Sequence, residues 1–110
     1  MLNDTISKIE AKLQNSSSIK EEQRSELLNL LSTLKREISA LSGTHDEEAE
    51  SIAGFAELSA HEATRAEKNP ELLKLSVQGL SSSVEGFEKS HPQLVGLVNR
   101  IATTLSNMGI

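Results

Sequence analysis

Apolar residues recur at spacings of three and four along almost the whole chain, and this period predicts helices. No stretch of the sequence shows the alternating β-branched pattern that is typical of strands. Capping residues, glycines and prolines divide the pattern into five segments. We therefore expect an all-α fold: a short antiparallel helical bundle, or helical hairpins, built from heptad-patterned helices.

The first two segments, residues 4–15 and 18–42, predict a helical hairpin. Ser18 and Glu21 have the spacing of a capping box at the start of the second helix. Gly43 stands where a helix commonly ends with a left-handed residue.

The third segment, residues 44–68, predicts an acidic and alanine-rich helix that opens with a second capping box, Thr44 and Glu47. Its side chains are small, so we expect little burial per residue and weak packing. The acidic run Asp46–Glu50 could attract a basic partner, but carboxylates in a first turn are favoured by the helix dipole alone.

The last two helices are bounded by proline. Asn69 is expected to cap a helix that has Pro70 at its first position, and Pro92 ends the run before the final helix. At the terminus, Gly109 suits a left-handed residue, and Ile110 an apolar contact with the preceding helix. We expect a single domain over residues 1–110. It has three parts: a helical hairpin over residues 1–42, an acidic helix over residues 44–68 and a helix pair over residues 70–110.

Three of these segments carry apolar stripes at heptad spacing, which form the candidate packing or interaction surface. The stripes consist of Leu27, Leu31, Leu34, Ile38, Leu41, Leu73, Val77, Leu80, Val84, Phe87, Leu94, Val98, Ile101 and Leu105. Each stripe lasts about two repeats, too short for a free coiled coil. A monomer could fold its helices on themselves, but stripes of this kind also serve symmetric helical dimers. We expect a homo-oligomer, with a dimer favoured.

Composition narrows the class of protein further. The chain has 110 residues, a formal net charge of -5, 36% hydrophobic and only 2% aromatic residues. A thin aliphatic core suits interdigitated helices better than it suits an enzyme pocket. The sequence has no basic stripe, so we expect no nucleic acid partner. It has no apolar run of membrane-spanning length and no secretory signal, so we expect no transmembrane segment and a cytoplasmic protein.

Candidate chemistry is sparse. His61 and Glu62 begin like the zinc-protease helix, but Arg65 stands where the second histidine ligand must be, so a Glu62–Arg65 pair on a solvated helix face is expected. His45, His61 and His91 lie on three separate segments. We therefore expect no catalytic residues, no metal and no cofactor. His91, beside a helix start, is expected to bond helix-end groups, with a partner or pH-sensing role as the alternative.

The C-terminal third resembles a family of small bacterial proteins catalogued as domain of unknown function 4404. The resemblance rests on Phe87-Glu88, His91-Pro92, Ile101-Ala102 and the closing run Leu105–Ile110. It implies a bacterial, helical, intracellular protein. It supplies no activity, cofactor or catalytic residue.

Two functions remain open. The first is a self-associating protein–protein interaction or scaffold module without catalytic activity. The alternative is an accessory or regulatory subunit that packs a helical stripe on a larger enzyme or a membrane-associated complex.

The stripes give a first test. Leu34→Asp or Val84→Asp should unfold or dissociate the protein, because each places an unpaired charge in an apolar stripe. Circular dichroism and molar mass by light scattering measure the two effects. Helicity and mass that stay unchanged in both variants would contradict the stripe assignment.

Overall fold

The computed structural model describes residues 2–17 and 19–108, and the side chains of 4–17 and 19–108. Within these ranges the chain forms five α-helices and a short 3₁₀ turn, with no strand, which confirms the all-α prediction. The elements are α1 (Leu2–Asn15), α2 (Glu21–Ala40), α3 (Asp46–Ala63), α4 (Pro70–Ser82), η1 (Glu85–Phe87) and α5 (Pro92–Met108).

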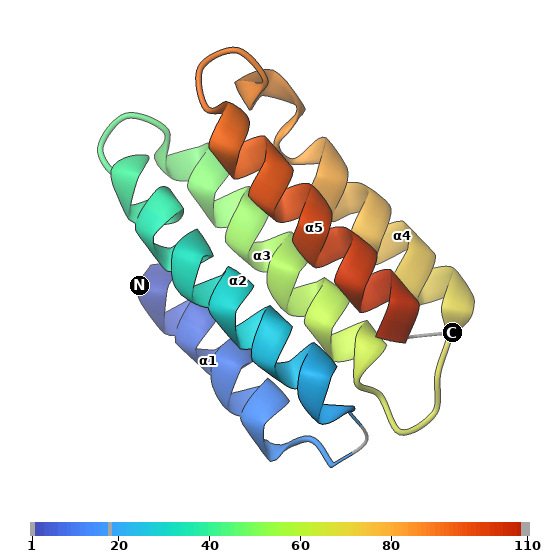
Figure 1. Ribbon diagram of the computed structural model, residues 1–110. Coiled ribbons are helices and arrows are strands. Elements are labelled where there is room, and N and C mark those ends of the chain that lie inside the picture. The colour runs from blue at the N-terminus through green and yellow to red at the C-terminus, as the bar shows by residue number, and fades with distance from the viewer. Residues whose placement is uncertain (1, 18, 109–110) are drawn as a thin grey trace.

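The helices form two layers (Figure 1). In one layer α1, α3 and α4 lie side by side, with α3 in the middle; in the other, α2 and α5 lie against each other. Helix α2 covers α1, and α5 covers both α4 and α3. One aliphatic core fills the space between the layers, so the three-helix layer has an inner face on the core and an outer face toward solvent.

The position of α3 differs from the sequence expectation. Instead of packing weakly, α3 contacts α1, α4 and α5, and it buries residues along its whole length. Its buried side chains are mainly alanines, including Ala49, Ala56 and Ala63. Small side chains let neighbouring helices approach closely, so the alanine content that lowers burial per residue also permits the central position.

Several predicted boundaries are confirmed. Gly43 has a φ of 86° in the turn after α2, a conformation that glycine adopts without penalty. The Asn69 side chain accepts a hydrogen bond of 3.1 Å from the Leu72 backbone N–H, and Pro70 is the first residue of α4. Helix α5 begins at Pro92.

Both predicted capping boxes are wrong in their boundaries. Helix α2 begins at Glu21 with Lys20 as its N-cap, and Ser18 lies outside the described residues. Helix α3 has His45 as its N-cap without a side-chain cap bond. The Thr44 hydroxyl instead donates to the Leu41 carbonyl at 3.2 Å. Thr44 therefore stabilises the turn after α2 and does not cap α3.

The third and fourth helices are shorter than predicted. Helix α3 ends at Ala63 rather than near residue 68, and the Thr64 hydroxyl donates to the Ala60 carbonyl at 2.8 Å where the helix stops. Helix α4 ends at Ser82, so Val84 and Phe87 follow it in a turn and in η1 while remaining buried. Serine hydroxyls compete for helix carbonyls, and Ser83 donates to Leu80 O at 2.6 Å at this end. The predicted contacts of Gly109 and Ile110 lie outside the described residues.

An arginine connects the first two helices. Arg24 on α2 donates through Nε to the Leu13 carbonyl at 3.1 Å and also bonds the Ser16 carbonyl and the Glu21 carboxylate. A cation at these carbonyls satisfies acceptors that the end of α1 leaves open and complements its dipole. The serine-rich turn is therefore held by the helix that follows it.

Ser59 provides a test of the packing around α3. Its side chain is fully buried, and its hydroxyl has no hydrogen-bond partner among the described residues. We expect Ser59→Ala to stabilise the protein by about 1 kcal/mol, because it removes an unsatisfied polar group and raises helix propensity. Urea unfolding measures the change.

The matched control is Ser76→Ala on α4. Ser76 is also buried, but its hydroxyl donates to the Leu73 carbonyl at 2.8 Å. Its replacement should therefore give no comparable gain. Equal gains at both positions would show that helix propensity alone, and not the unsatisfied hydroxyl, determines the effect.

Candidate functional site

The predicted stripe residues lie in the core of the single chain. All are buried except Val77, which is half-buried and packs against that core. The structure brings the three stripes together between the two layers, where their side chains contact one another. They are therefore not exposed for docking in this conformation, and an interaction surface has to be found elsewhere.

Four large apolar side chains are exposed on α3 and α4, and we call them the outer apolar surface. They are Phe55 (36% exposed), Leu58 (44%), Leu72 (43%) and Leu75 (54%). They fall on adjacent helices of the three-helix layer, on its outer face. Single exposed leucines are ordinary on a protein surface, whereas a group of large apolar side chains on two neighbouring helices makes this face the candidate for an interaction surface.

The aromatic residue of this surface, Phe55, packs against a glycine of α4, Gly79. A Cβ on Gly79 would lie 2.3 Å from Cε1 and 2.6 Å from Cδ1 of the Phe55 ring. The ring therefore lies directly over the α4 backbone, in space that only a glycine leaves open. The heptad stripes do not include any residue of this surface. The signal was present in Leu72 and Leu75, which lie outside the stripe of their own segment.

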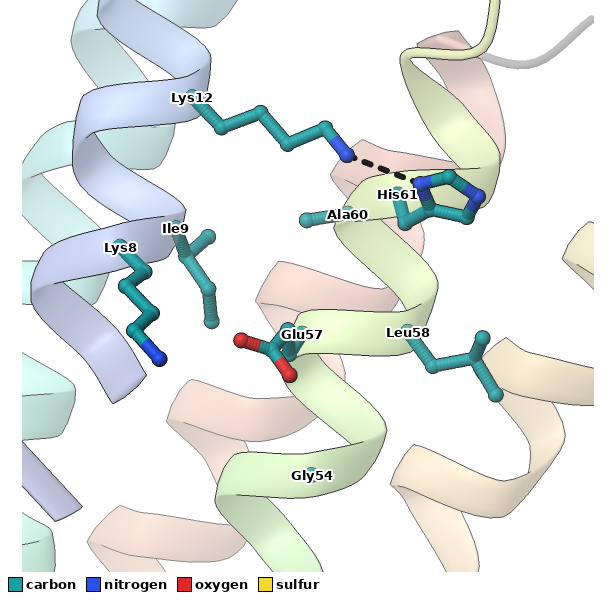
Figure 2. A pocket seen from close by; sticks show the side chains of 8 residues that line it. All are labelled: Lys8, Ile9, Lys12, Gly54, Glu57, Leu58, Ala60 and His61. Carbon is teal, nitrogen blue, oxygen red and sulfur yellow. Dashed lines mark hydrogen bonds between the residues drawn. The ribbon is translucent and has the colours of Figure 1, made fainter. Parts of the chain in front are cut away.

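Beside the outer apolar surface lies an open cleft of about 400 Å³ between α1 and α3 (Figure 2). Lys8 and Lys12 extend from α1, and Glu57 and His61 extend from α3. Leu58 belongs both to this cleft and to the outer apolar surface. The cleft and the surface therefore form one continuous region on the outer face.

Two polar side chains of the cleft, Lys12 and His61, contact each other across it. Lys12 Nζ lies 2.9 Å from His61 Nδ1 (Figure 2). An ammonium group can only donate, so His61 Nδ1 is the acceptor of this contact. Further along α3, Glu62 pairs with Arg65 at 2.9 Å, as expected from their spacing. The expected solvated helix face is wrong, because the Glu62 side chain is buried and Arg65 only partly exposed. These contacts connect α1 to α3 and close the end of α3; they do not converge on a place for a reacting atom.

The model of a family described as a domain of unknown function (DUF4404) matches residues 30–110. The chain belongs to the DUF4404 family. The match spans the second half of α2 and all of α3, α4 and α5, and so includes both helices of the outer apolar surface. No curated protein and no solved structure was found to match the chain.

Two histidines of the DUF4404 chain meet although they lie on separate segments. The rings of His45 and His91 have centroids 5.9 Å apart, and each lies 5.3 Å from the Phe87 ring, all in edge-on arrangements. His91 Nδ1 lies 3.0 Å from the Ser90 hydroxyl, and its backbone N–H donates to the Phe87 carbonyl at 2.8 Å. The cluster packs the turn after α2 against η1.

The remaining polar candidates are also local. Asp46 accepts a 2.8 Å hydrogen bond from the Gly43 backbone N–H, so the start of the acidic run Asp46–Glu50 takes part in the turn before α3. Among residues 2–17 and 19–108, no three histidine or carboxylate side chains gather where they could hold a metal ion. Over the same part of the chain, no helix is long and apolar enough to cross a membrane.

The contact between Phe55 and Gly79 can be tested by substitution. Gly79→Ala should displace the Phe55 ring, because the new methyl group would occupy its place. Gly96→Ala on α5 is the control, since nothing lies within 4 Å of a Cβ there. Both changes add helix propensity of up to about 1 kcal/mol. We expect Gly96→Ala to raise the stability measured by thermal unfolding and Gly79→Ala not to raise it. An equal gain for Gly79→Ala would contradict the tight contact between Gly79 and the Phe55 ring.

Proposed function

We propose that this protein is a self-associating interaction module that acts without catalysis, and that it associates through the outer apolar surface. The observation that carries the proposal is the exposure of Phe55, Leu58, Leu72 and Leu75 on two adjacent helices. Burying these side chains on a second surface would remove apolar area from water, at roughly 25 cal/mol for each Å².

The proposal changes the surface expected from sequence but keeps the class of function. The heptad stripes are occupied by the chain's own core, so they do not serve as the docking surface. The absence of catalysis is part of the proposal, and the arrangement of the polar groups supports it. Lys12 with His61, and Glu62 with Arg65, form contacts that stabilise helices and helix ends.

The test is absolute molar mass by light scattering over a hundredfold range of concentration. We expect a mass that rises with concentration in the unchanged chain. Leu58→Ser combined with Leu75→Ser should shift association to at least tenfold higher concentration, because both side chains are exposed and would be buried on association. Thermal unfolding of the dilute monomer should change little.

Asn99→Ser is the control, since Asn99 is exposed on α5 in the other layer. It should associate like the unchanged chain. A monomer at every concentration would contradict self-association and favour the alternative, an accessory subunit that docks on a larger partner. Association that Leu58→Ser and Leu75→Ser leave unaltered would place the contact on a different surface.

A further inference from the structure

We draw no further inference here: the strongest candidate, the open cleft between α1 and α3 beside the outer apolar surface, belongs to the region already described, and nothing among the described residues shows which ligand or partner covers it.

Discussion

The close packing of a small-residue helix at the middle of a layer is the constraint on which the rest of the fold depends. Helix α3 contacts α1, α4 and α5, and alanines and a buried serine make up most of its inner face. Larger side chains there would push the neighbours away from α3 and open the core that α2 and α5 cover. The large aliphatic residues of the other helices supply the apolar area, and α3 sets their spacing.

Most of the fold could be predicted from the sequence because its signals are local. Helical periodicity, Gly43 in its turn, Asn69 with Pro70 and the proline at residue 92 all act within a few residues of themselves. The capping box of Thr44 failed because a hydroxyl has more than one carbonyl or N–H within reach, and Thr44 bonds the preceding turn. The hydrogen-bond partner of the hydroxyl depends on where the preceding helix ends. The spacing of Thr and Glu in the sequence does not determine that point.

The candidate site was harder to predict because it depends on contacts between helices. The heptad stripes identified the core residues, but the stripes of one chain satisfy each other once the layers form. The surface left over consists of residues outside the stripes, such as Phe55 and Leu75, whose exposure follows only from the order of the helices in space. The meeting of His45 and His91 has the same cause, since no sequence spacing connects those two segments.

The edge position of α1 has a consequence for motion within the native state. Helix α1 contacts only its neighbours α2 and α3 extensively, and it buries Ile6, Ile9 and Leu13. An end helix held by so few large side chains can detach at a lower free energy than the whole domain unfolds. Such an opening would leave α2 through α5 assembled while uncovering the flank of α3 that lines the cleft. Local opening of α1 would therefore expose the side of α3 that borders the face proposed for recognition.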